Sequence, residues 1–166
     1  MPANATKILI ETTIPNYILA RRGEKSLLSK KLLEFIQKGE FQAYITDVLI
    51  EEIEHTPKEE HRKKLVKVLD NFPSRLLFRD SVSENLADKY IKAKIIPAKV
   101  RNDALQVAIA TTNLIPTIVT WNLTHLANLK NVEKINSLNS SFGYPQLKIL
   151  TPYELVGYLL KDRVKK

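Results

Sequence analysis

The stretch from Arg101 to His125 constrains the fold more than any other part of the chain. It begins with a predicted helix, from near Asp103 to about Asn113, whose side chains are apolar nearly all the way round. Such a helix is expected to be buried on every side. Pro116 then breaks the helix, and a β-rich run follows, Thr117-Ile118-Val119-Thr120-Trp121. A buried helix that leads into a buried strand is typical of an α/β protein.

The same alternation extends along the whole chain. We expect strands at residues 7–10, 41–45, 75–79, 117–121 and 147–150. Helices are expected at residues 16–19, 24–37, 48–55, 56–72, 81–91, 103–113 and 129–138, with a last helix from residue 151. Strands that alternate with helices predict a three-layer α/β/α sandwich with a central parallel sheet.

Capping signals predict where several of these helices begin. The pattern Ser/Thr-x-x-Glu occurs at Thr56–Glu59, at Ser81–Glu84 and at Thr151–Glu154, and we predict a capping box at each. Thr46 or Asp47 is expected to cap the helix after the second strand.

Length and composition indicate one folded domain. The 166 residues, 44% of them hydrophobic, are enough for a core, which we expect to span residues 7 to 160 before a short basic C-terminal tail. Cysteine is absent, so disulfides and thiolate metal sites are excluded. The N-terminus does not resemble a secretory signal, and no run approaches the about 18 apolar residues of a membrane helix. We therefore expect a soluble cytoplasmic protein that does not bind membranes.

The chain is basic, with a net charge of +8. An excess of that size favours an anionic partner, and nucleic acid is the first candidate. The alternative is a soluble protein that is merely basic.

Acidic and amide side chains cluster near the predicted strand ends. Glu11 ends the first strand, Glu51 and Glu52 lie in the helix after the second, and Asn122 follows the fourth. The carboxyl ends of parallel strands share one edge of a sheet, where ligands bind. Asp103 lies in the first turn of the buried helix and precedes its strand, so this argument does not place it. Whether Glu51 or Glu52 faces the edge is open, since adjacent helical residues point about 100° apart.

Several carboxylates in one place would repel and raise one another's pKa unless a cation binds. Hard oxygen ligands without cysteine favour Mg²⁺ or Mn²⁺. Such an ion can activate water and neutralise a phosphodiester transition state. An acidic metal site on a basic protein is what a nuclease requires.

At these residues the sequence resembles the PIN domain, the fold of the VapC-type ribonuclease toxins. It is most similar to a subgroup whose first strand ends in Glu-Thr-Thr-Ile-Pro. The matching stretches are LIETTIPNYILARR, TDVLIEEI, RNDALQVAIA, TWNLTHLAN and ILTPYEL. The resemblance covers residues 7 to about 160. It implies a parallel sheet between helices and RNA cleavage with Mg²⁺ or Mn²⁺ held by three or four acids.

The resemblance also implies site residues and partners. The first three acids fall on Glu11, Glu52 and Asp103, as metal ligands, and the fourth position falls on Asn122. Two departures from the usual aspartates follow: Glu11 is longer by one methylene, and Asn122 offers a carbonyl oxygen without a charge. Members of the family commonly form homodimers. A small antitoxin neutralises them, and here one of its arginines would face the three acids.

Other residues are weaker candidates for substrate contacts. Thr12 can hold Glu11 or a metal-bound water, or simply cap a helix. His125 can contact a phosphate or a base, although a lone histidine is usually structural. Arg101 can contact the RNA backbone. Basic residues at 21–22 and 61–64 either line an RNA path or form solvated faces. Trp121 is expected in the core.

Two functions remain in view. The first is a metal-dependent endoribonuclease, the toxin of a toxin–antitoxin pair. The second is a non-catalytic PIN-like module that binds RNA or protein, which Glu11 and Asn122 in place of aspartate would suit. A haloacid-type phosphatase is disfavoured because the first strand lacks an Asp-x-Asp pair.

Overall fold

The computed structural model describes residues 5–156, and within them the strands form one parallel sheet of order β3-β2-β1-β4-β5. The strands are β1 (Thr6–Ile10), β2 (Phe41–Thr46), β3 (Ser74–Leu77), β4 (Thr117–Val119) and β5 (Lys148–Leu150). All four neighbouring pairs run parallel, as between Leu9 of β1 and Tyr44 of β2. The predicted tail and the predicted domain limit at residue 160 lie outside the described residues.

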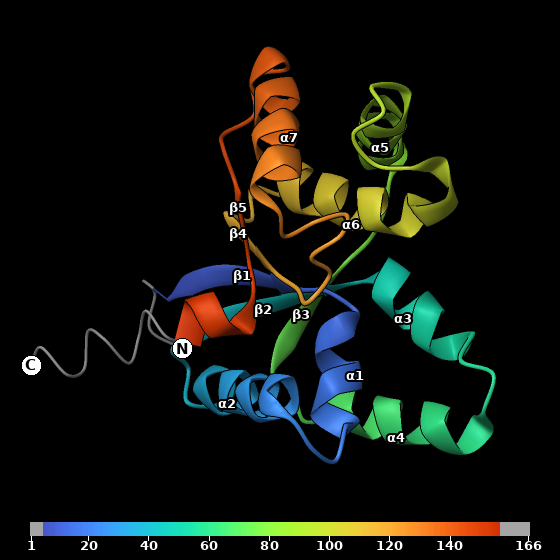
Figure 1. Ribbon diagram of the computed structural model, residues 1–166, viewed down its shortest axis with the longest axis vertical. Helices are drawn as coiled ribbons and strands as arrows, with labels where there is room; N and C mark the ends of the chain where they lie inside the picture. The colour runs from blue at the N-terminus through green and yellow to red at the C-terminus, as the bar shows by residue number, and fades with distance from the viewer. Residues whose placement is uncertain (1–4, 157–166) are drawn as a thin grey trace, which may run out of the picture.

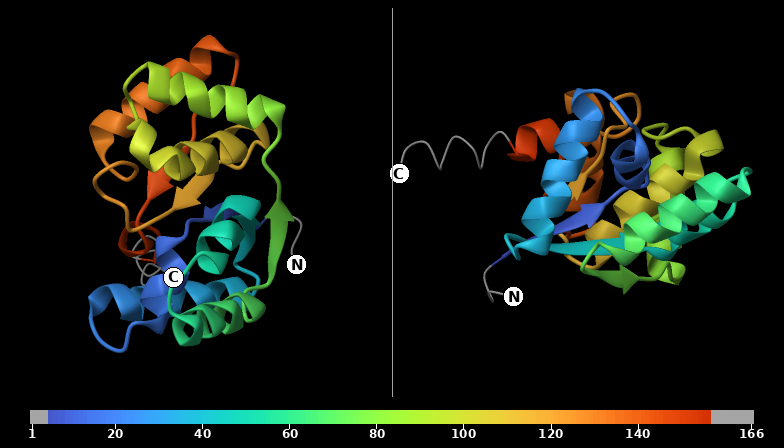
Figure 2. Two further views of the ribbon diagram at one scale, coloured as in Figure 1. Left: turned by 90° about the vertical axis from the view of Figure 1, so that its right-hand side faces the viewer. Right: turned by 90° about the horizontal axis from the view of Figure 1, so that it is seen from below.

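Helices cover both faces of this sheet (Figure 1). They are α1 (Thr13–Leu19), α2 (Glu24–Gln37), α3 (Asp47–Glu54), α4 (Glu59–Asp70), α5 (Ser81–Lys92), α6 (Arg101–Thr112) and α7 (Leu129–Ser141), with a 3-10 turn η1 (Ala98–Val100) before α6. In the side view of Figure 2, α5, α6 and α7 lie on one side of the strands and α2 and α4 on the other. The predicted three-layer α/β/α sandwich with a parallel sheet is confirmed.

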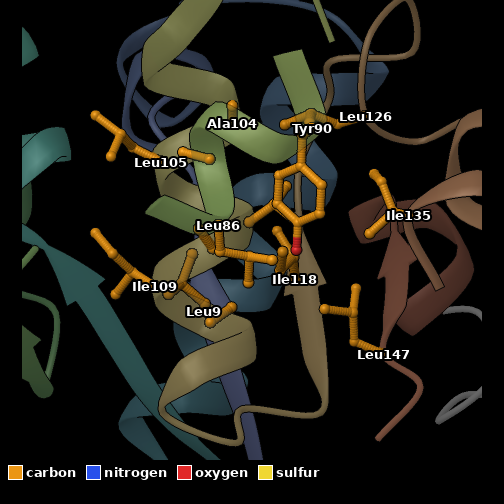
Figure 3. Close-up of a cluster of buried hydrophobic side chains, with 14 of the residues drawn as sticks. Leu9, Leu86, Tyr90, Ala104, Leu105, Ile109, Ile118, Leu126, Ile135 and Leu147 are labelled. Atoms are coloured by element: carbon orange, nitrogen blue, oxygen red, sulfur yellow. The ribbon is translucent and has the colours of Figure 1, made fainter. Parts of the chain in front are cut away.

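Side-chain alternation along the central strand divides the core into two clusters. Leu9 packs with α5, α6 and α7, whereas Ile8 and Ile10 pack with α1, α2 and α4. Residues on a strand point alternately to its two faces, so a strand covered on both sides must be apolar at every position. Figure 3 shows the first cluster, in which Leu9 and Ile118 of the sheet meet Tyr90 of α5.

Helix α6 is buried at every position from Ala104 to Thr111, as its sequence predicts. The observed limits of α6 and of the strand after it differ from the predicted ones. The helix begins at Arg101, two residues before Asp103, and β4 ends at Val119 instead of residue 121. The strand stops because the backbone N–H of Trp121 donates to the Thr13 hydroxyl at 2.9 Å instead of to a neighbouring strand.

Two of the three predicted capping boxes are wrong. Helix α4 begins at Glu59, after Lys58, with no side-chain cap, because the Thr56 hydroxyl donates back to the Glu52 carbonyl. Helix α5 is capped by Asp80, which accepts from the Ser83 N–H at 2.8 Å, so Ser81 lies inside the helix.

The remaining capping predictions are confirmed. The Thr151 hydroxyl accepts from the Glu154 N–H, and the Glu154 carboxylate accepts in return from the Thr151 N–H, both at 3.2 Å. Thr46, the first of the two alternatives for α3, accepts from the Leu49 N–H. Within residues 5–156, no helix combines the length and the hydropathy needed to cross a bilayer.

Candidate functional site

The strand order places a topological switch point between β1 and β4. From β1 the chain first builds outward through β2 and β3, and then returns to the other side of β1 with β4 and β5. Open parallel sheets bind ligands at the carboxyl ends of the strands where the order reverses. Ile10 pairs with Val119 in the β1–β4 register, so Glu11 and Thr120 lie side by side just past the two strand ends.

Glu11 is held at this edge by neutral donors. Its exposed fraction is 3%, and its Oε2 accepts bonds from the Thr13 N–H (3.0 Å), the Thr13 hydroxyl and the Thr120 hydroxyl (2.7 Å). Of the described residues, none donates to Oε1. Burial raises the pKa of the Glu11 carboxyl despite these three bonds, and the negative charge of Asp103 raises it further.

Glu52, and not Glu51, faces the other acids. Burial raises the pKa of Glu52 to about 7, with the charges of Glu11 and Asp103 adding to the rise and hydrogen bonds from Thr12 and Asn102 opposing it. Glu51, one position earlier on α3, instead forms an ion pair with Arg79. The structure thus resolves the alternative that the sequence left open.

Arg79 follows β3 and holds the start of α3 as well. Its guanidinium donates to Asp47 at 3.0 Å, and its backbone N–H donates to the same carboxylate at 3.1 Å. Asp47 is the first residue of α3, so these bonds fix the helix that carries Glu52 against the end of β3.

Asp103 reaches the same edge because α6 returns the chain from the carboxyl ends of the strands to the start of β4. Its Oδ2 accepts from the Asn122 side-chain amide at 3.0 Å. Burial raises the pKa of Asp103, while the charge of His125 and the bond from Asn122 act in the opposite direction. A residue that precedes its strand in sequence therefore lies beside residues that follow it.

Asn122 uses both ends of its amide. The nitrogen donates to Asp103, and the oxygen accepts from the His125 backbone N–H at 3.0 Å. Turning the amide over would face oxygen to carboxylate and N–H to N–H, so the two contacts fix its orientation. The carbonyl oxygen of Asn122 thereby caps the turn at residues 122–125.

The weaker candidates lie as follows. Thr12 contacts Glu52 and Gln106 instead of Glu11. Arg101 pairs with Asp88 of α5, and both side chains are partly exposed. His125 is half-buried near Asp103. Trp121 is in the core, as expected, with an exposed fraction of 8%.

Sequence reasoning missed three residues that contact the acids, Asn102, Thr13 and Thr120, and a fourth, Gln106, that contacts Thr12. The positions of Thr13 and Thr120 were recoverable from the sequence, since Thr13 lies two residues after Glu11 and Thr120 ends the predicted strand. No local signal marks Gln106, a polar residue in the middle of an apolar helix. Its place near the acids is visible only from its contact with Thr12, which lies 94 positions away in sequence.

The donor set suits a hard divalent cation in chemistry but is not closed around one. Glu11, Glu52 and Asp103 offer only oxygen ligands, and each has a raised pKa that a cation would reverse. Across residues 5–156, however, no three acidic or histidine side chains stand in a ligating arrangement. Like charges move apart when nothing lies between them, so binding would require rotation of these side chains toward the ion.

No family model matches the chain, and no curated protein matches it either. Solved structures, however, do match the chain. A chain of the VapBC2 complex from Rickettsia felis, bound to a DNA fragment from its promoter, has a TM-score of 0.57 at 16% identity, covering 88% of this chain and 98% of that one. A chain of a toxin–antitoxin complex from Klebsiella pneumoniae has a TM-score of 0.54 at 15% identity, covering 75% and 93%. The fold is therefore PIN-like, similar to chains of toxin–antitoxin complexes.

Proposed function

We propose that the chain is a metal-dependent endoribonuclease, the toxin of a toxin–antitoxin pair. The observation that carries this proposal is the gathering of Glu11, Glu52 and Asp103 at the carboxyl edge of the sheet, beside the switch point. No lysine or arginine of the described chain forms an ion pair with any of the three. Buried acids that pair with no lysine or arginine are most simply explained by a cation that binds among them.

In this reading, Glu11, Glu52 and Asp103 hold Mg²⁺ or Mn²⁺. When bound, the ion supplies an activated water and neutralises charge on the phosphodiester. The chain's own residues prepare the ligands. Thr13 and Thr120 orient Glu11, and Asn122 orients Asp103. These neutral donors fix the carboxylates without neutralising them, which leaves the negative charge for the ion.

Basic side chains beside α3 support RNA as the substrate. A surface hollow of about 430 Å³ is lined by Arg62, Lys63 and Lys67 of α4 and by Glu54 at the end of α3. Together with the net charge of +8, it offers a path for a polyanion close to the helix that carries Glu52. The likeness to chains of toxin–antitoxin complexes supports an antitoxin partner. A homodimer is expected from the family resemblance, and sedimentation velocity tests it.

The deciding experiment compares wild type, Asp103→Asn and Asp70→Asn by Mn²⁺ calorimetry and by RNA cleavage with and without EDTA. Asp103→Asn keeps an oxygen that accepts from Asn122 but removes the charge, so we expect the fold to persist while Mn²⁺ binding and cleavage disappear. Asp70→Asn, the same change at an exposed acid at the end of α4, should behave as wild type. Full cleavage of RNA by Asp103→Asn would contradict the proposal.

The second candidate function is a non-catalytic PIN-like module that binds RNA or protein. The lack of a closed three-ligand arrangement within residues 5–156 favours it. This module would bind RNA equally well in EDTA and would yield no products with any divalent metal. Metal-dependent products that vanish in Asp103→Asn would exclude it.

A further inference from the structure

Gln106 is a fully buried amide in α6 to which the proposed function assigns no role. It lies three residues after Asp103, one helical turn along and on the same face. Its Nε2 donates to the Thr12 hydroxyl at 2.9 Å. The Thr12 hydroxyl in turn acts on the Glu52 carboxyl as a hydrogen-bond donor that lowers its pKa, so the amide reaches an acid of the site through one intermediate.

The direction of this chain follows from the single proton of the threonine hydroxyl. Once Glu52 is ionised, as a metal ligand is, its carboxylate only accepts, so Thr12 must donate its proton to Glu52. The hydroxyl oxygen is then free to accept from the Gln106 Nε2. With the amide turned over, its oxygen would take the Thr12 proton and Glu52 would lose this donor.

The other end of the amide argues against a purely packing role. Gln106 Oε1 is buried and has no hydrogen-bond partner among the described residues. An unsatisfied buried acceptor destabilises a fold, and an apolar side chain of similar length would avoid that cost. What distinguishes glutamine from methionine at this position is the bond from Nε2 to Thr12.

We propose that Gln106 is a positioning residue, whose amide directs the Thr12 hydroxyl toward Glu52 and so holds that carboxylate beside Glu11 and Asp103. The inference rests on the proposed function in taking Glu52 as a metal ligand. Partners behind a ligand typically change metal affinity by about 10- to 100-fold when removed.

The first test is Gln106→Met, measured by Mn²⁺ calorimetry and by thermal unfolding in EDTA. We expect Mn²⁺ affinity to fall about tenfold, while the unfolding temperature stays the same or rises because the orphaned oxygen is gone. The matched control is Thr111→Val, a buried hydroxyl on the same helix that contacts Tyr90 and Asn139 away from the site. It should lower the unfolding temperature and leave Mn²⁺ affinity unchanged.

A double-mutant cycle tests whether Gln106 acts through Thr12. Thr12→Val should lower Mn²⁺ affinity, and adding Gln106→Met should lower it no further, because the chain is already broken. A further tenfold loss in the double variant would overturn the inference. So would wild-type affinity in Gln106→Met, or failure of both Gln106→Met and Gln106→Leu to fold, since the role would then be packing.

Failure of the proposed function is distinguishable from failure of this inference. If wild type binds no Mn²⁺, the metal site is refuted, and crystal structures of metal-free wild type and Gln106→Met decide the positioning role. Loss of the Thr12–Glu52 contact in the variant supports that role. Retention of the same contact in both structures overturns it.

Discussion

Neutral donors hold each of the three acids. Glu11 accepts from two threonines, Glu52 from Thr12 and Asn102, and Asp103 from the amide of Asn122. Hydrogen bonds of this kind favour the charged form, but burial outweighs them at all three positions. Ionisation of the three carboxyl groups therefore destabilises the metal-free folded protein.

This destabilisation predicts a pH dependence of stability. A carboxyl whose pKa is raised in the folded state holds its proton there when the unfolded chain has lost it. The folded protein should therefore lose stability as pH rises from about 4.5, the ordinary pKa of a glutamate, to about 7, the pKa of Glu52 in the folded protein. Glu11 and Asp103 act in the same direction.

The variant Glu52→Gln removes one of the three carboxyl groups whose pKa is raised. In EDTA at pH 8 we expect it to be more stable than wild type by about 1–2 kcal/mol, a value that allows for the partial exposure of the side chain. At pH 4.5 the difference should vanish. Urea unfolding at the two pH values measures both. Equal stability at pH 8 would show that Glu52 carries no such penalty.

A substitution at Asn122 tests the same repulsion in the opposite direction, because it adds a carboxylate to the site. Asn122→Asp replaces the donor to Asp103 with a fourth carboxylate, so the metal-free protein should lose about 1–2 kcal/mol from repulsion and the lost bond. Mn²⁺ should then raise the unfolding temperature more in the variant than in wild type, because the ion relieves that repulsion. Thermal unfolding in EDTA and in Mn²⁺ measures both effects, and an equal Mn²⁺ shift in the two proteins contradicts the expectation.

At the scale of elements, the orientation of α3 decides which glutamate reaches the site. Arg79, just past β3, binds Asp47 and Glu51 on one side of the helix, and Glu52 then points toward Glu11 and Asp103. The ion pair with Asp47 is partly buried, with about a quarter of each side chain exposed. It is therefore better protected from solvent than an ordinary surface pair.

We expect Arg79→Ala to lower the free energy of unfolding by about 1–2 kcal/mol, because it leaves Asp47 half-buried without its cation. Arg75→Ala, at an exposed position on β3, is the matched control and should change stability by less than about 0.5 kcal/mol. Urea unfolding measures both variants. Equal losses in the two would mean that net charge matters and the ion pair does not.

At the scale of the whole molecule, one sheet joins two apolar clusters. Strands β1, β2 and β4 contribute buried side chains to both clusters, so neither cluster can be exposed without disrupting the sheet. We therefore propose that the described residues form one cooperative domain. Far- and near-ultraviolet circular dichroism should report the same unfolding midpoint in urea. Two separate transitions would show that the clusters are independent units.

Local patterns in the sequence were sufficient for the elements of this fold. Continuous apolar runs and a helix apolar on every side predict strands and helices that are covered on both faces, and these were confirmed. Helix starts were less predictable. The motif Ser/Thr-x-x-Glu predicted the box at Thr151 correctly. Its predictions at Thr56 and Ser81 were wrong, because a nearby acceptor or a better cap at Asp80 competed for the same groups.

The candidate site also combines features that the sequence predicts with features that depend on the tertiary structure. That Glu11 and Asn122 lie at one edge follows from the sequence alone, because parallel strands align their carboxyl ends. Three facts depended on the tertiary structure: that Asp103 meets Asn122, that Glu52 turns inward while Glu51 binds Arg79, and that Gln106 contacts Thr12. Each depends on the packing of one element against another, which short-range periodicity does not encode. The sequence by itself therefore determined which residue types gather at the sheet edge, whereas the tertiary structure decided which atoms meet there.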